Sequence, residues 1–115
     1  MPFEKVATID DLDVGSAIAV EVGGIPIALV RVASEVVKAI HNICSHQYYE
    51  LAPEGCVEDS SIECALHGSV FDLDTGDPRT LPAIDPLPVY TCEISDRDIL
   101  VDVDRQRNTA QPPRH

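Results

Sequence analysis

Long apolar runs and basic residues are both scarce in this chain of 115 residues. No apolar stretch approaches the roughly 20 residues that a membrane span needs, and the first residues carry no signal-peptide pattern. We therefore expect a cytoplasmic protein with no membrane contact. Eight Lys and Arg stand against 20 Asp and Glu, which gives a net charge of −12. Because nucleic-acid binding requires clustered basic side chains, nucleic acid is not an expected partner.

Helical periodicity is missing as well. The apolar residues fall in short runs that are separated by Gly, Pro and polar turns, a pattern typical of an all-β sandwich or barrel. The Gly23-Gly24 pair predicts a two-residue hairpin. Strands are predicted at 3–8, 17–22, 25–32, 36–40, 61–63, 69–73, 89–94 and 99–103.

The length fits a single domain, which we place at 1–104. Residues 1–42 and 79–104 form its β base, and residues 43–78 form an inserted lobe that is rich in turn residues and poor in apolar runs. A proline-punctuated loop, 78–88, leads back to the base. The last eleven residues, RQRNTAQPPRH at 105–115, have no apolar pattern, so we expect a disordered tail.

Two spaced motifs carry the chemistry. C-x-H starts at Cys44 and ends at His46, and C-x-x-H runs from Cys64 to His67, which together read C-x-H-x17-C-x-x-H. Two thiolates on one iron and two imidazoles on the other are the ligand set of a Rieske [2Fe–2S] centre. With two ferric ions, two sulfides and neutral imidazoles, the formal charges sum to zero, which makes reduction easier than in a four-cysteine cluster. One such cluster per chain is predicted.

A structural zinc site is the alternative for the same four residues. Zinc sites of this ligand type usually show C-x2–4-C and H-x3–5-H spacing. Here each half pairs a cysteine with a histidine, and the first gap is one residue. The spacing therefore favours iron and sulfide, although a zinc-binding structural module stays open at this point.

The other cysteines and histidines have no partner motif. We predict that Cys56 and Cys92 are packing residues, since cysteine is often buried as a small apolar side chain. A disulfide between them is left open, but a reducing compartment disfavours it. His41 and His115 are expected to be ordinary histidines.

The lobe is acidic. Residues 44–77 contain eight carboxylates and neither Lys nor Arg. Such a surface is common as a solvated face, but around a redox centre it also steers toward basic patches on partner proteins. The same negative field opposes an incoming electron. The eight are Glu50, Glu54, Glu58, Asp59, Glu63, Asp72, Asp74 and Asp77.

The segments HNICSH, IECALHGSVFDLDTG and LPAIDPLPVY together resemble the soluble Rieske-type ferredoxins over nearly the whole chain. The resemblance implies the Rieske fold, an antiparallel β-sandwich or barrel with a small inserted cluster-binding lobe. It implies an electron carrier without substrate chemistry, which links a flavin-containing reductase to the terminal oxygenase of an aromatic-ring dioxygenase system. The exposed His46 and His67 edge and the acidic lobe would dock the partners of a monomer. A role beside iron–sulfur cluster assembly is the alternative.

Departures from high-potential respiratory Rieske proteins refine this expectation. Tyr49 and Leu66 stand where those proteins carry a disulfide, so that disulfide is absent. Ser69 matches a serine that bonds a bridging sulfide, but Phe71 replaces a tyrosine that bonds a ligand cysteine. Because hydrogen bonds to sulfur stabilise the reduced cluster, losing one predicts a low potential.

Two further residues, one in the lobe and one in the loop that follows it, are expected to shape the surroundings of the cluster. Gly68 permits a close approach of the backbone. Pro82, with the other prolines of the loop 78–88, resembles the family's cover loop, which keeps water from one side of the cluster.

Overall fold

A computed structural model of the chain describes residues 3–45, 49–52, 54–65, 68–80 and 85–112. These residues form nine strands and one short 3-10 helix, and no helix among them is long and apolar enough to cross a membrane. The elements are β1 Glu4–Thr8, η1 Ile9–Asp11, β2 Ala17–Val22, β3 Ile25–Ala33, β4 Val36–His41, β5 Cys56–Glu58, β6 Ser61–Glu63, β7 Val70–Asp72, β8 Val89–Ser95 and β9 Asp98–Gln106.

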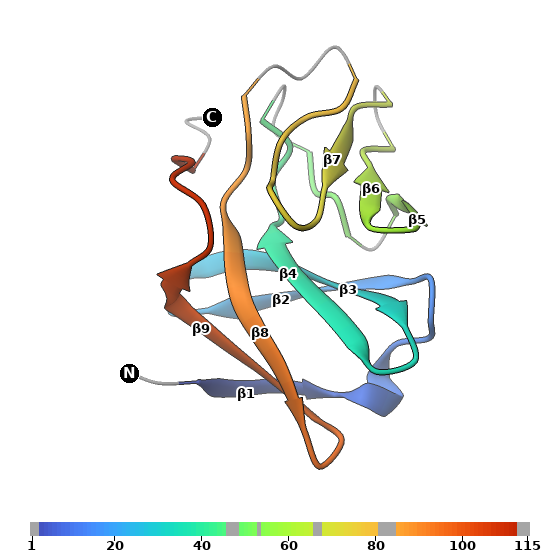
Figure 1. Cartoon of the computed structure of the whole chain (residues 1–115), viewed down its shortest axis with the longest axis vertical. Coiled ribbons are helices and arrows are strands. Elements are labelled where there is room, and N and C mark those ends of the chain that lie inside the picture. The colour runs from blue at the N-terminus through green and yellow to red at the C-terminus, as the bar shows by residue number, and fades with distance from the viewer. Residues whose placement is uncertain (1–2, 46–48, 53, 66–67, 81–84, 113–115) are drawn as a thin grey trace.

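The larger sheet is an antiparallel arrangement of six strands in the order β1-β9-β8-β4-β3-β2. Its edge strands β1 and β2 lie against each other, so the sheet curls into a nearly closed barrel (Figure 1). Gly23 and Gly24 join β2 to β3 with φ angles of 58° and 82°, the positive values that a type I′ hairpin turn requires. The predicted all-β class is confirmed.

Strand β3 is buried on both faces. Ile27 and Leu29 point into the barrel, whereas Ala28 and Val30 point outward into a second apolar cluster. All four are fully buried, because the alternating side chains of a strand fill both cores. This explains why the sequence at 25–30 is continuously apolar instead of alternating.

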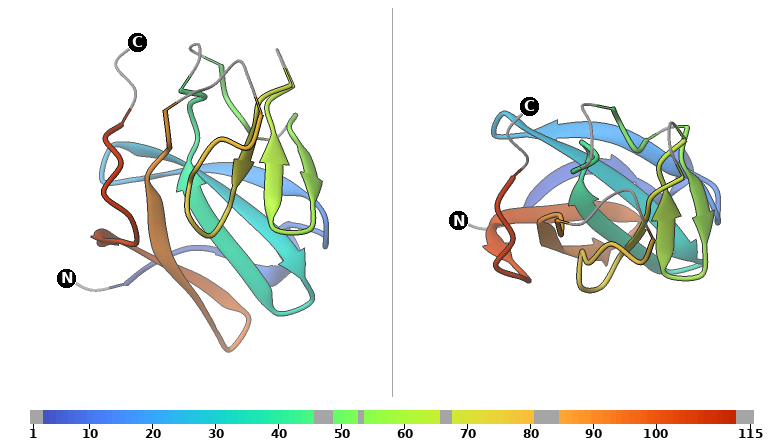
Figure 2. Two further views of the ribbon diagram at one scale, coloured as in Figure 1. Left: turned by 45° about the horizontal axis from the view of Figure 1, so that its top comes forward. Right: turned by 90° about the horizontal axis from the view of Figure 1, so that it is seen from above.

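The smaller sheet, β5-β6-β7, lies above the outer face of β3 and β4 (Figure 2). Its buried residues Ile62 and Phe71 belong to the same cluster as Ile40 of β4 and Leu87 of the segment before β8. The lobe and the barrel therefore share one apolar interface. Within the described residues, β5 and η1 are two elements that the sequence pattern did not predict.

The predicted start of the tail is wrong. Strand β9 continues to Gln106, and the backbone N–H of Arg107 donates a 2.6 Å hydrogen bond to the carbonyl of Val89. The side chain of Asn108 then bonds Thr75 and Leu87. Polar side chains and backbone groups, not apolar periodicity, hold this segment in place.

Candidate metal centre

Cys44 and Cys64 are brought into one buried environment. Cys44 follows the end of β4, and Cys64 follows β6 directly. Each is 1% exposed, and both belong to the cluster formed between barrel and lobe. Two thiols that follow strands of different sheets thus lie in the same apolar environment, as a shared centre requires.

Each cysteine opens a loop that its own backbone closes. The N–H of Cys44 donates to the carbonyl of Tyr49 at 2.9 Å, and the N–H of Cys64 donates to the carbonyl of Ser69 at 2.7 Å. The two acceptors lie the same number of positions further along the chain, so the loops are equivalent. We call them the Cys44 loop (44–49) and the Cys64 loop (64–69). His46 and His67 belong to these loops in sequence, and both lie outside the described residues.

The proline loop, residues 78–88, is bonded to both cysteine loops. The hydroxyl of Ser45 donates to the carbonyl of Asp85 at 2.6 Å. On the other side, the hydroxyl of Thr80 donates to the carbonyl of Gly68 at 3.1 Å and accepts from the N–H of Val70 at 3.0 Å. These hydrogen bonds therefore fix the positions of the three segments relative to one another. Pro82 lies outside the described residues.

The residues that were expected to surround the centre are in suitable positions. Ser69 and Phe71 are both fully buried, and Phe71 belongs to the same apolar core as Cys44 and Cys64. Gly68 has a φ of +78°, which an L side chain rarely adopts. The glycine thus lets the Cys64 loop turn back toward Ser69.

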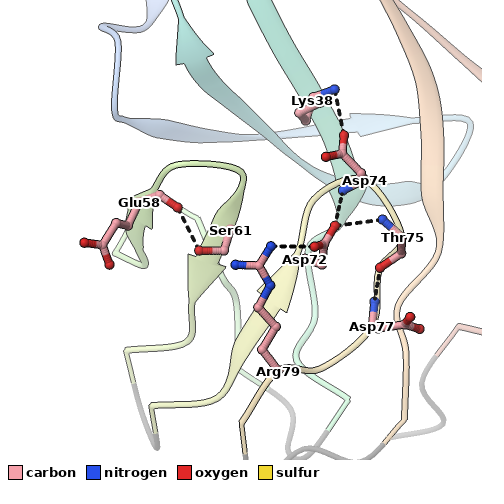
Figure 3. Close-up of polar contacts among 8 residues, drawn as sticks. All are labelled: Lys38, Glu58, Ser61, Asp72, Asp74, Thr75, Asp77 and Arg79. Atoms are coloured by element: carbon pink, nitrogen blue, oxygen red, sulfur yellow. Dashed lines mark hydrogen bonds and ion pairs between the residues drawn. The ribbon is translucent and has the colours of Figure 1, made fainter.

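The turn after β7 is fixed by Asp72 (Figure 3). Its carboxylate accepts from the N–H groups of Asp74 and Thr75 at 2.8 and 3.0 Å and from Arg79 at 2.5 Å. Partial burial raises the pKa of Asp72, but these hydrogen bonds and the charge of Arg79 outweigh it and hold the pKa below its usual value. Asp74 in turn pairs with Lys38 of β4 at 2.8 Å. The lobe is thereby tied to the barrel.

The remaining lobe carboxylates form an exposed acidic surface. Arg79 and Lys38 neutralise Asp72 and Asp74. The other six are exposed and make no ion pair within the described part of the chain. We call them the six free carboxylates: Glu50, Glu54, Glu58, Asp59, Glu63 and Asp77.

The two other cysteines lie apart from this centre. Cys92 is partly buried against the barrel core, and burial raises the pKa of its thiol to about 12, which disfavours the thiolate that metal binding needs. Cys56 is exposed on β5, so its prediction as a packing residue is wrong: its side chain is on the outer face of an edge strand. Neither forms a disulfide, and both are described residues.

The donor set fits a [2Fe–2S] cluster with mixed ligands. Two buried thiols at the start of equivalent loops supply the soft donors, and each loop contains one histidine in sequence. Among the described residues alone, no group of three metal-ligating side chains occurs, because both histidines fall outside them.

Comparison with known proteins agrees with this assignment. The Rieske [2Fe-2S] domain family matches residues 3–91. The anthranilate 1,2-dioxygenase ferredoxin subunit of Burkholderia cepacia is 37% identical, and the match covers 88% of this chain and 92% of that protein. The ferredoxin of carbazole 1,9a-dioxygenase from Nocardioides aromaticivorans is 37% identical with a TM-score of 0.81, over 88% and 97% of the two chains. A complex of reduced oxygenase and oxidized ferredoxin in carbazole 1,9a-dioxygenase contains a chain that is 30% identical, with a TM-score of 0.80 over 90% and 94%.

Proposed function

The chain belongs to the Rieske [2Fe-2S] domain family, and from this we propose that it is the electron-carrying ferredoxin of an aromatic-ring dioxygenase system. It receives electrons from a flavin-containing reductase and delivers them to a terminal oxygenase. The observation that carries the proposal is the pair of equivalent loops that open at Cys44 and Cys64 within one buried apolar core. When bound, the [2Fe–2S] cluster supplies a one-electron redox couple.

Four side chains hold the cluster in this proposal. Cys44 and Cys64 bind one iron from the buried side, and His46 and His67 bind the other. The burial of both thiols supports the first half of this assignment. The second half rests on the spacing of the motifs and on the family, since both histidines lie outside the described residues.

The chain's own residues keep water from the buried thiols. Leu51, Phe71 and Leu87 are fully buried in the same cluster as the two cysteines. The proline loop adds a polar strap, because it bonds both cysteine loops through Ser45 and Thr80. In our proposal Ser69 donates to a cluster sulfide, a role that its complete burial next to the Cys64 loop supports.

A low midpoint potential follows from two features of the lobe. Phe71 offers no hydroxyl to a ligand sulfur, and the six free carboxylates give the lobe that contains the centre an exposed negative charge. Both features disfavour the reduced, more negative state. We therefore place the potential nearer −150 mV than +300 mV on the range of about −150 to +300 mV for Rieske centres. A redox titration with a clearly positive midpoint would contradict this assignment.

The acidic lobe is the docking face in this proposal. Exposed charges of one sign raise the rate of encounter with a partner of opposite sign. The reductase and the oxygenase would then present basic patches, and the His46 and His67 side of the lobe would face them. Action as a monomer and a cytoplasmic location stay predictions.

The ligand assignment is tested with the variant His67→Cys. The purified wild-type protein should be brown and, after reduction, show an EPR signal with an average g below 2. The variant should keep a cluster with more negative charge and therefore have a lower midpoint potential. An unchanged colour and midpoint would show that His67 is not a ligand, and a colourless wild-type protein that contains zinc would overturn the cluster itself.

The carrier role is tested separately. The oxidised protein is mixed with a dioxygenase reductase and NADH, and its reduction is followed by visible absorption. Turnover of the matching oxygenase should then depend on the concentration of this protein. A protein that dithionite reduces but dioxygenase reductases do not would favour the role in iron–sulfur cluster assembly.

A further inference from the structure

A single side chain beyond the part of the chain that matches the family joins the lobe to the barrel. The family match ends at residue 91, whereas Asn108 follows the end of β9. The amide nitrogen of Asn108 donates to the carbonyls of Thr75 and Leu87 at 2.7 and 2.8 Å. Its amide oxygen accepts from the N–H of Val89 at 3.2 Å and from the side chain of Gln106 at 2.9 Å. The whole amide is thus engaged.

The two carbonyls that Asn108 binds lie at the two ends of one segment. Thr75 precedes the segment 76–86, and Leu87 follows it. The backbone closes the same point, since the N–H of Leu87 donates to the carbonyl of Gly76 at 2.8 Å. A Cβ on Gly76 would lie 2.0 Å from the oxygen of Leu87 and 2.6 Å from the amide nitrogen of Asn108. The residues meet so closely here that only glycine fits.

The far side of this segment touches both cysteine loops. It includes most of the proline loop, which Ser45 and Thr80 connect to the Cys44 loop and the Cys64 loop. Asn108 therefore fixes the base of this segment, which we call the strap, and Thr80 and Asp85 bond its described far part to the two cysteine loops. In Figure 1 the C-terminal segment runs beside the upper part of β8, where the strap rejoins the barrel.

We propose that Asn108 is a positioning residue: by fixing Thr75 and Leu87 it keeps Thr80 and Asp85 bonded to the two cysteine loops, and so limits the access of water and chelators to the metal centre. This inference rests on the proposed cluster. An asparagine is suited to the task because one amide presents two N–H donors and an acceptor. An aspartate of the same shape would keep the acceptor but turn negative oxygen atoms toward two carbonyls.

The test compares Asn108→Asp and Asn108→Ala with Thr91→Val in the full-length protein that contains the cluster. Thr91 is the matched control, because its hydroxyl donates to the carbonyl of Arg105 at 2.7 Å and so ties the same C-terminal segment without touching the strap. The first readout is the rate at which visible absorption is lost in the presence of a ferrous-iron chelator. We expect roughly 30-fold faster loss in both Asn108 variants, the factor that the loss of two typical hydrogen bonds corresponds to, and no change in Thr91→Val.

Two further readouts separate positioning from general stability. Amide hydrogen exchange at Leu87 and Val89 should accelerate in the Asn108 variants, because their N–H groups lie at the base of the strap. The midpoint potential should rise, since water that reaches the centre stabilises its more negative reduced state. Loss rates and exchange equal to the wild type in folded Asn108→Asp would overturn the proposal.

The same design keeps this inference apart from the proposed function. If the wild-type protein holds no cluster, the proposed function fails, yet exchange at Leu87 and Val89 still reports whether Asn108 closes the strap. If Asn108→Ala does not fold, Asn108→Asp at neutral pH carries the comparison. Equal chelator sensitivity in Asn108→Asp and Thr91→Val would mean that the C-terminal segment only adds stability.

Discussion

The hydroxyl of Ser45 donates a 2.6 Å hydrogen bond to the backbone carbonyl of Asp85. This contact connects the Cys44 loop to the proline loop across a separation of 40 positions in the sequence. In sequence Ser45 lies between Cys44 and His46, two of the proposed ligands. We therefore expect the loss of this hydrogen bond to affect the centre directly.

Replacing Ser45 by alanine should weaken this connection by about 1 kcal/mol, the typical net value of one hydrogen bond. We expect faster loss of visible absorption in the presence of a chelator, with little change in the unfolding of the barrel. Ser61→Ala is the matched control, because Ser61 donates a 2.8 Å bond to the carbonyl of Glu58 within the β5–β6 hairpin (Figure 3). Equal rates in the two variants would show that the Ser45 contact does not protect the centre.

Phe71→Tyr should raise the midpoint potential. The ring is fully buried in the same apolar core as both cysteines, and we expect the added hydroxyl to donate to a ligand sulfur there. One electron corresponds to about 59 mV for each tenfold change in equilibrium constant, and we expect a rise of some tens of millivolts. Phe71→Leu, which adds no donor, controls for altered packing. A potential that stays constant or falls would mean that the hydroxyl does not reach the sulfur.

His41 should make the folded state sensitive to acid. Burial lowers the pKa of His41 below 6.5, and its Nδ1 atom has no hydrogen-bond partner. The unfolded chain therefore binds a proton at a pH where the folded chain does not. The contribution of His41 to the free energy of unfolding has its full value above pH 6.5. It decreases as the pH drops toward the folded-state pKa, by at most about 1.4 kcal/mol per pH unit.

This dependence is measured by urea unfolding between pH 5 and 7.5 for the wild type and for His41→Leu. Subtracting the curve of the variant cancels the contributions of the other titrating groups. The free energy of unfolding of the wild type should fall relative to that of the variant toward low pH, because the variant has no histidine at position 41 to protonate. Parallel curves would contradict the assignment of a neutral buried His41.

The six free carboxylates should control the rate of electron transfer. Neutralising Glu50 and Glu54 to glutamine should slow the association with a basic partner and flatten its dependence on salt, because exposed charges act mainly on encounter. Stopped-flow reduction by a dioxygenase reductase at several salt concentrations measures this. Glu4→Gln and Glu21→Gln on the barrel remove the same charge far from the lobe in sequence. If they slow the reaction equally, net charge rather than the lobe is responsible.

The fold class and most strands could be predicted because their signal is apolar patterning. Strand β3 is the clearest case, since its centre, Ile27 to Val30, is buried on both faces and is therefore apolar at consecutive positions. The contacts of Asn108 near the C-terminus could not be predicted in the same way. Asn108 acts through hydrogen bonds to backbone carbonyls that lie far away in sequence, and a polar segment that is tied down in this manner looks like a tail.

The sequence singles out the two buried cysteines of the candidate centre, but not the contacts that hold its loops together. The motif spacing names Cys44 and Cys64, and the structure buries both in one cluster. Nothing in the sequence marks Ser45 or Thr80 as the residues that join the proline loop to the cysteine loops, because their partners are main-chain carbonyls. The general rule for cysteine also failed at Cys56, where an edge strand turns the thiol outward.

Because β3 contributes one face to the barrel core and the other to the core beneath the lobe, the described parts of lobe and barrel are joined through a strand that both of them bury. An opening of the lobe would expose Ala28 and Val30 and so remove support from the strand that also carries Ile27 and Leu29. Lobe and barrel should therefore melt in one cooperative transition. Loss of the metal centre would then weaken the barrel as well as the lobe, so the whole domain becomes more accessible to proteolysis.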